Sequence, residues 1–203
     1  MSEIKIYNKD CLIEMRKMKD NAFDLAIVDP PYGIKKNMVG SRQMGLQIKN
    51  KTWNDDIPKK EYFEELFRVS VNQIIFGANY YSSFLPHTRG WLVWDKKMSE
   101  NIGFSMNEIA FTSFDCVPKT FYCRADRLDR IHPCQKPVKL YEWILDNYAK
   151  NNHSILDTHL GSGSIALACI NMNFNLTSYE IDKEYYHNAV DRIKKHRKQL
   201  KIF

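Results

Sequence analysis

The sequence predicts an α/β fold in which helices alternate with a doubly wound, mostly parallel sheet of seven strands. Three observations support this prediction. Short apolar segments of strand length recur along the 203 residues, segments with helical spacing of apolar residues separate several of them, and a glycine turn joins a strand to a helix at Gly161. A chain of this length has room for one ordinary domain, which is expected to span residues 1–203.

The expected strands are short runs rich in β-branched, aliphatic and aromatic residues. They are residues 4–7, 25–28, 73–76, 91–94, 109–114, 155–156 and 176–181. Helices are expected at 59–71, at 138–148, directly after the glycine turn, and through the evenly spaced Tyr185, Ala189 and Ile193. Only residues 33–57 and 115–136 lack a pattern over any length.

The composition excludes several classes of protein. A hydrophobic fraction of 44% with 13% aromatic residues is typical of a globular chain, and no apolar run is long enough to cross a membrane. The first residues already read as a strand and lack the apolar core of a signal peptide. A cytoplasmic protein without membrane contact is therefore expected.

The five cysteines predict reduced thiols. Their number is odd and no Cys-x-x-Cys pair occurs, which argues against a disulfide framework. Cys116, Cys123, His132 and Cys134 could be imagined as zinc ligands, but the gaps between them match no common zinc-finger spacing. The sequence therefore predicts no bound metal.

The tetrapeptide Asp29-Pro30-Pro31-Tyr32 follows an apolar run that ends at Val28. Two prolines cannot donate to a strand ladder and they stiffen the exit loop, so an acid and a ring are held beyond the carboxyl end of the strand. Open α/β sheets bind ligands there. The Asp29 carboxylate and the Pro30 carbonyl suit the N–H groups of an exocyclic amine, and Tyr32 offers a stacking face. The alternative is a strand followed by a structural proline turn.

The turn Gly161-Ser162-Gly163 lies between a short apolar strand and a helical pattern. Its glycines allow a sharp turn and a close approach to a ligand, and Glu180, about 20 residues further on, suits a ribose diol. With Ala166 in third place the turn also fits a dinucleotide fingerprint, so an NAD-dependent oxidoreductase is an alternative. Such a fingerprint normally opens its fold, whereas here one strand and one helix follow.

A third motif reads His132-Pro133-Cys134-Gln135-Lys136-Pro137. With Asp10 and Cys11 near the start, the order is acid, Asp-Pro-Pro-Tyr, His-Pro-x-Gln-Lys-Pro, glycine turn and then Glu180. This order resembles the permuted motif order of the β-class DNA amino-methyltransferases, which modify adenine N6 or cytosine N4, and the resemblance runs from about residue 4 to about residue 190. Two departures are Cys134 in place of threonine and Asp157-Thr158-His159 in place of Asp-Pro-Phe.

The resemblance implies a Rossmann-like methyltransferase fold with one antiparallel strand, the seventh, and S-adenosylmethionine as cofactor. It implies that Asp29, Pro30 and Tyr32 are catalytic. It assigns cofactor binding to Asp10, Cys11, Lys136, Pro137, Asp157, His159, Gly161, Ser162, Gly163 and Glu180. For His159 a buried structural role is an equal alternative to a flat cofactor contact.

The net charge of +6 and the pI near 9.0 favour an anionic partner, for which double-stranded DNA is expected. A basic stretch starts three residues after Tyr32, and the candidate DNA contacts in it are Lys35, Lys36, Arg42, Gln43 and Gln47. Residues 33–57 and 115–136 are the candidate DNA-contacting loops, with a solvated basic loop as the alternative for the first. A second basic stretch, residues 192–201, is expected to be a solvated helix face.

The predicted reaction is methylation of adenine N6 in DNA, because Asp leads the tetrapeptide and the cytosine-N4 enzymes more often have Ser there. The base must leave the helix first, since its amine is inaccessible within the stack. Cytosine N4 and RNA adenine are alternative targets, and a catalytically silent DNA-binding protein is an alternative of another class. With no room for a separate recognition region, a short target, relaxed specificity or a homodimer is expected.

Overall fold

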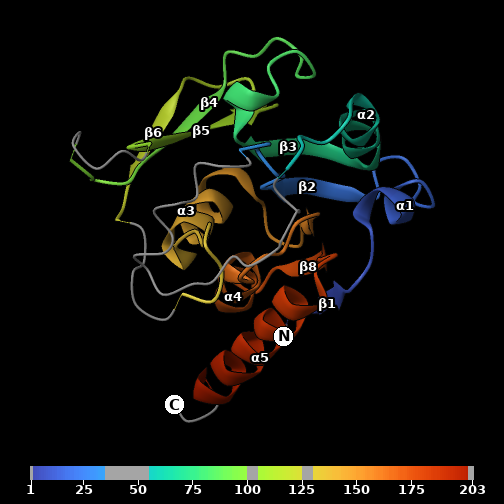
Figure 1. Cartoon of the computed structure of the whole chain (residues 1–203), viewed down its shortest axis with the longest axis vertical. Coiled ribbons are helices and arrows are strands. Elements are labelled where there is room, and N and C mark those ends of the chain that lie inside the picture. The colour runs from blue at the N-terminus through green and yellow to red at the C-terminus, as the bar shows by residue number, and fades with distance from the viewer. Residues whose placement is uncertain (1, 35–54, 100–104, 125–129, 201–203) are drawn as a thin grey trace.

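The computed structural model describes residues 2–34, 55–99, 105–124 and 130–200. Within them an eight-stranded sheet has the order β1-β8-β7-β2-β3-β5-β4-β6 (Figure 1). The strands are β1 (Ile4–Tyr7), β2 (Phe23–Val28), β3 (Ser70–Phe76), β4 (Trp91–Asp95), β5 (Asn107–Thr112), β6 (Lys119–Tyr122), β7 (Ser154–Asp157) and β8 (Asn175–Tyr179). The predicted α/β class with a mostly parallel sheet is confirmed, with one strand more than the seven expected.

The additional strand is β6, which lies inside residues 115–136, a segment whose sequence pattern predicted no regular structure. Its four residues pair in parallel with β4, from Lys119 opposite Leu92 to Tyr122 opposite Asp95. The four residues of β6 include only two apolar side chains and lie within an otherwise irregular segment, and their pairing depends on a separate strand of the chain, β4. Strand β5 is antiparallel to both of its neighbours, β3 and β4. The expected seventh strand, residues 176–181, corresponds to β8 and pairs in parallel with β1 and β7, so the antiparallel strand is not the seventh along the chain.

The helices occupy the connections between the strands. They are α1 (Cys11–Met15), α2 (Lys60–Val69), the 3₁₀ helix η2 (Ala78–Tyr80), α3 (Val138–Tyr148), α4 (Ser164–Asn171) and α5 (Lys183–Leu200). Helix α2 ends two residues before its predicted end because Ser70 and Val71 begin β3. Helices α1 and η2 are too short to produce a periodic signal in the sequence.

Strand β2 is buried on both faces, which fixes the position of the residues that follow it. Leu25 and Ile27 pack into a core with side chains of α3, α4 and α5, whereas Ala26 and Val28 pack into a second core with side chains of α1 and α2. The helices therefore cover both faces of the sheet (Figure 1), and a central parallel strand of this kind is apolar throughout. None of the described helices combines the length and the apolar character needed to cross a bilayer.

All five cysteines lie in the described part and are free thiols. No group of three or more His, Cys, Asp or Glu side chains within the described ranges is arranged to hold a metal ion.

Candidate functional site

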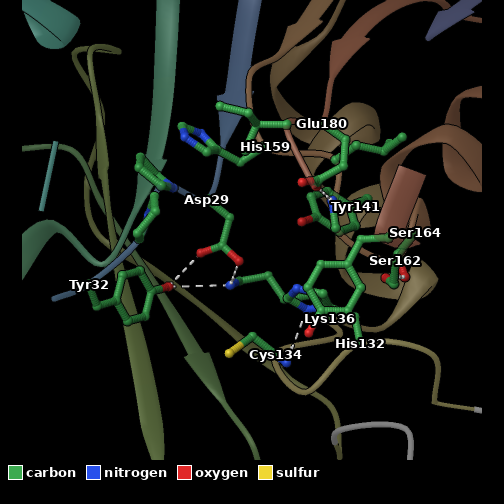
Figure 2. Close-up of a pocket in the computed structure, with 16 residues that line it drawn as sticks. Asp29, Tyr32, His132, Cys134, Lys136, Tyr141, His159, Ser162, Ser164 and Glu180 are labelled. Carbon is green, nitrogen blue, oxygen red and sulfur yellow. Dashed lines mark hydrogen bonds and ion pairs between the residues drawn. The ribbon is translucent and has the colours of Figure 1, made fainter. Parts of the chain in front are cut away.

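Three of the predicted segments converge at one edge of the sheet. Asp29, Gly161 and Glu180 follow β2, β7 and β8, which are parallel neighbours in the order β8-β7-β2, so their carboxyl ends point the same way. A cavity of about 300 Å³ lies at this edge (Figure 2). It is lined by Asp29, Pro30, Pro31, Tyr32, His132, Cys134, Lys136, Tyr141, His159, Leu160, Gly161, Ser162, Ser164, Glu180, Ile181 and Tyr185.

The cavity brings together most of the predicted catalytic and cofactor residues. The lining contains Asp29, Pro30, Tyr32, Lys136, His159, Gly161, Ser162 and Glu180 but not Asp10, Cys11, Pro137, Asp157 or Gly163. Asp10 caps α1, where its carboxylate accepts hydrogen bonds from two backbone N–H groups, and Pro137 and Gly163 are the residues before α3 and α4. These residues position the backbone that leads to the cavity.

The stiff loop after β2 is tied down by one phenol. The Tyr81 hydroxyl lies 2.6 Å from the carbonyl oxygens of both Pro30 and Pro31, to which it donates. A carbonyl oxygen has two lone pairs, so the Pro30 oxygen retains a second acceptor position.

The ring of Tyr32 is fixed by close packing. It stacks on Tyr80 with ring centroids 5.0 Å apart, and a Cβ atom added at Gly77 would lie 2.3 Å from its Cε1 atom. Gly77 also has a left-handed φ of +73°, so this position requires glycine on both counts. Tyr80 thus covers one face of the Tyr32 ring, the ring that was predicted from the sequence to stack on a base.

The Asp29 carboxylate belongs to a buried charged cluster. The Lys136 ammonium nitrogen lies 2.5 Å from Asp29 Oδ2 and 2.9 Å from Glu108 Oε2, and the Lys136 side chain is only 2% exposed. The Tyr32 hydroxyl donates to Asp29 Oδ1 at 2.6 Å, as Figure 2 shows. On the outer side, the Lys96 ammonium nitrogen lies 2.8 Å from Glu108 Oε1.

The cluster shifts the titration of its members in different directions. Burial raises the pKa of Asp29, and the nearby negative charge of Glu108 adds to this, so that together they outweigh the opposing attraction of Lys136. Burial would also raise the pKa of Glu108, but Lys136 and Lys96 outweigh it and lower that pKa to about 2. Burial would lower the pKa of Lys136, yet Asp29 and Glu108 outweigh it and raise that pKa, so Lys136 stays charged.

Sequence reasoning missed Glu108 and Lys96. Glu108 directly precedes the expected strand 109–114 and is the second residue of β5, so the sequence pattern left it out of the strand, and Lys96 directly follows β4. Glu108 is the partner of both Lys96 and Lys136; Lys136 is remote in the sequence, and the strand order β3-β5-β4 brings Glu108 to it. Lys136, predicted for the cofactor side, pairs with Asp29 as well as lining the cavity.

On the opposite side of the cavity, Glu180 is held by the backbone. Its Oε2 atom accepts a hydrogen bond from the N–H of Gly161 at 2.8 Å, and its Oε1 atom accepts one from the N–H of Asp182 at 2.9 Å. Gly161 has a φ of +53°, in the left-handed region, so the turn brings a backbone donor to the carboxylate at no steric cost.

Helix α5 supports the same turn through Arg192. Its Nη1 atom donates to the carbonyl oxygen of Ser162 at 3.0 Å and contacts the hydroxyl oxygen of Ser164 at 2.9 Å. The prediction that residues 192–201 form only a solvated face is therefore wrong for Arg192. A charge pattern on a helix carries no information about the loop that lies beneath it.

Asp157 and His159 are ionisable groups held in poorly solvated positions. Asp157 accepts hydrogen bonds from the hydroxyl of Ser178 at 2.8 Å and the N–H of His159 at 3.1 Å, but burial raises its pKa to about 7. Burial lowers the pKa of His159 to about 4, against a smaller opposing effect of Asp10. Its Nδ1 atom is 2.9 Å from the Thr158 hydroxyl. His159 is thus both packed and part of the cavity wall.

The candidate DNA contacts in the first basic stretch lie outside the described residues. They are Lys35, Lys36, Arg42, Gln43 and Gln47.

Comparison with known proteins identifies relatives of the whole architecture. The sequence profile of a DNA methylase family matches residues 79–191. Type II methyltransferase M.HpaI from Haemophilus parainfluenzae is 23% identical in an alignment that covers 88% of this chain and 70% of that protein.

Two solved structures share the fold. The complex of M1.HpyAVI with SAM has a TM-score of 0.63 and 22% identity, covering 94% of this chain and 98% of the other. The PvuII DNA methyltransferase, described as cytosine-N4-specific, has a TM-score of 0.65 and 12% identity, covering 98% of this chain and 93% of the other.

The pKa of Asp157 predicts a pH-dependent stability. Between pH 4 and 7 the unfolded chain has released a proton that the folded chain still holds at Asp157, whose pKa is raised to about 7, so ionisation destabilises the fold as the pH rises. In wild type the free energy of unfolding should therefore decrease between pH 4 and 7, and Asp157→Asn should reduce this decrease, by a few kcal/mol at most over about three pH units. Denaturant unfolding at several pH values measures it, with the exposed Asp146→Asn as the control. An unchanged slope in Asp157→Asn would contradict the assignment.

Proposed function

Because the chain belongs to the DNA methylase family, whose profile matches residues 79–191, we propose that it transfers a methyl group from S-adenosylmethionine to N6 of adenine in double-stranded DNA. The observation that carries the proposal is one cavity with two carboxylates, Asp29 after β2 and Glu180 after β8. The first suits an amine and the second a ribose.

The residues of the cavity fit S-adenosylmethionine. Glu180 presents a carboxylate already oriented by two backbone N–H groups, and a carboxylate is a strong acceptor for the two hydroxyls of a ribose. The rings of His159, Tyr141 and Tyr185 supply flat surfaces in the same lining, and the turn at Gly161 lets the backbone approach a ligand closely. When bound, this cofactor supplies a methyl group on a positively charged sulfur.

Asp29 and Pro30 would act on the target amine. An aromatic amine is a weak nucleophile because its lone pair is delocalised into the ring. Hydrogen bonds from the amine to the Asp29 carboxylate and the Pro30 carbonyl favour a more tetrahedral nitrogen whose lone pair is directed at the methyl carbon. The bound cofactor would supply the methyl carbon and keep the electron pair of the broken carbon–sulfur bond on its sulfur, and the methylated amine must then lose one proton, which Asp29 is placed to accept.

Adenine is favoured over cytosine because Asp29 leads the tetrapeptide. The adenine must be extruded from the duplex to reach the cavity, and the net charge of +6 favours contact with phosphates. Cytosine N4 is the competing target. A homodimer and the DNA contacts at Lys35, Lys36, Arg42, Gln43 and Gln47 stay predictions.

Identification of the modified nucleoside tests the target. We expect N6-methyladenine after incubation of the protein with S-adenosylmethionine and unmethylated DNA, followed by digestion to nucleosides and mass spectrometry. N4-methylcytosine as the product would show that the target is cytosine N4 and not adenine N6. Modification of RNA in preference to DNA would show that the substrate is RNA.

Asp29→Asn should reduce methyl transfer by about 10²-fold or more, because the neutral amide presents one acceptor instead of two and its NH₂ group faces the target amine. Affinity for S-adenosylmethionine should stay within a few-fold, since the proposed cofactor contacts lie across the cavity. A transfer assay and calorimetry measure the two quantities, with Asp146→Asn as the exposed control. Turnover at the wild-type rate in Asp29→Asn would contradict the proposed role of Asp29 as an acceptor for the target amine.

Glu180→Gln should weaken S-adenosylmethionine binding by about tenfold or more, since charge-assisted hydrogen bonds contribute about 1.5–3 kcal/mol each. The amide NH₂ would also face one of the two backbone N–H groups that now donate to Glu180. Calorimetry with the cofactor measures the change, and Glu184→Gln, at the start of α5, is the matched control. Tight NAD binding without S-adenosylmethionine binding would contradict the cofactor assignment.

A further inference from the structure

In this structure both oxygens of Asp29 have donors. Oδ1 accepts from the Tyr32 hydroxyl at 2.6 Å and Oδ2 faces the Lys136 ammonium nitrogen at 2.5 Å. Each oxygen keeps a further lone pair, so an amine that donates to Asp29 must share an oxygen with one of these two donors or displace it.

Glu108 lies where it can receive both competing donors. Its Oε2 atom is 2.9 Å from the Lys136 nitrogen and 3.3 Å from the Tyr32 hydroxyl oxygen. Rotation of the O–H bond alone redirects the Tyr32 hydrogen from Asp29 to Glu108, and an ammonium group has enough hydrogens to serve both carboxylates. Lys96 neutralises the other oxygen of Glu108, so the buried cluster tolerates two carboxylates.

We infer that Glu108 is a positioning residue: it can take over the hydrogen bonds that Lys136 and Tyr32 make to Asp29 in this structure, and so leaves Asp29 able to accept one from the target amine. This inference rests on the proposed function for its substrate. It depends on β5, which carries Glu108 to the end of β2 through the strand order β2-β3-β5.

The charges around Asp29 make the inference measurable. The positive charge of Lys136 favours the ionised form of Asp29, while the negative charge of Glu108 disfavours it. The other titratable groups that interact with Asp29 are Tyr32, Tyr62, Tyr81, Cys134, Tyr141 and Asp157. Without the Glu108 charge, Asp29 is the remaining carboxylate beside Lys136. The pKa of Asp29 should then fall and the Lys136–Asp29 ion pair should become stronger.

The decisive measurement is the titration of Asp29 by carboxyl-carbon NMR in the protein without substrate. Glu108→Gln should lower the midpoint by about one pH unit, and Lys136→Met should raise it by about one unit or more. Glu64→Gln, which breaks an exposed ion pair with Lys60 at 2.7 Å on α2, is the matched control and should leave it unchanged. No shift in Glu108→Gln, or shifts of the same sign in both cluster variants, would overturn the inference.

Methyl transfer against pH provides the second readout. In Glu108→Gln the acid limb should move to lower pH together with the NMR midpoint, while the plateau rate falls by about tenfold or more because the tighter Lys136–Asp29 pair hinders entry of the amine. A shifted midpoint with an unchanged plateau would overturn the positioning role. A wild-type protein without methyl transfer would instead refute the proposed function, and the NMR titration would still report on the cluster.

If Glu108→Gln does not fold, Lys96→Met tests the same arrangement from its outer side. Without Lys96, Glu108 holds Lys136 more strongly, so the Asp29 midpoint should rise; an unchanged midpoint would overturn the inference.

Discussion

The ammonium group of Lys136 is the interaction on which the site depends. It joins three segments that are remote in the sequence: the loop after β2, strand β5 and the segment before α3. Removing a buried charge from water is costly unless its partners are close and well oriented, and loss of one partner leaves the other uncompensated. The geometry of Asp29 is therefore tied to the packing of β5 against β3.

The site also contains groups whose ionisation works against folding. Burial raises the pKa of Asp157 to about 7 and lowers that of His159 to about 4. Arrangements of this kind concentrate at functional sites, where a fixed polar group is maintained at some loss of stability. The apolar packing of β2 on both of its faces supplies the rigid support that such a site requires.

The sequence predicted the features that local chemistry determines. The Asp29 tetrapeptide and the Gly161 turn each combine a strand end with residues of restricted or unusual backbone freedom, so their positions at the edge of the sheet could be predicted from a few adjacent residues. Glu108 and Arg192 could not be assigned, because each depends on a partner brought near by the fold. Strand β6 was missed for the same reason, since its four residues acquire meaning only beside β4.

The sheet order has a consequence for how the chain assembles. The first strand, β1, pairs with the last, β8, and β7 and β8 lie between β1 and β2. During synthesis the first two strands are made early but cannot occupy their final places until the last two are available to fill the gap. Contacts of such long sequence separation form slowly because of the loop-closure entropy. The edge that carries Asp29 is thus incomplete until β7 and β8 have been made, and the unpaired sides of β1 and β2 are the surfaces exposed to misassembly in that interval.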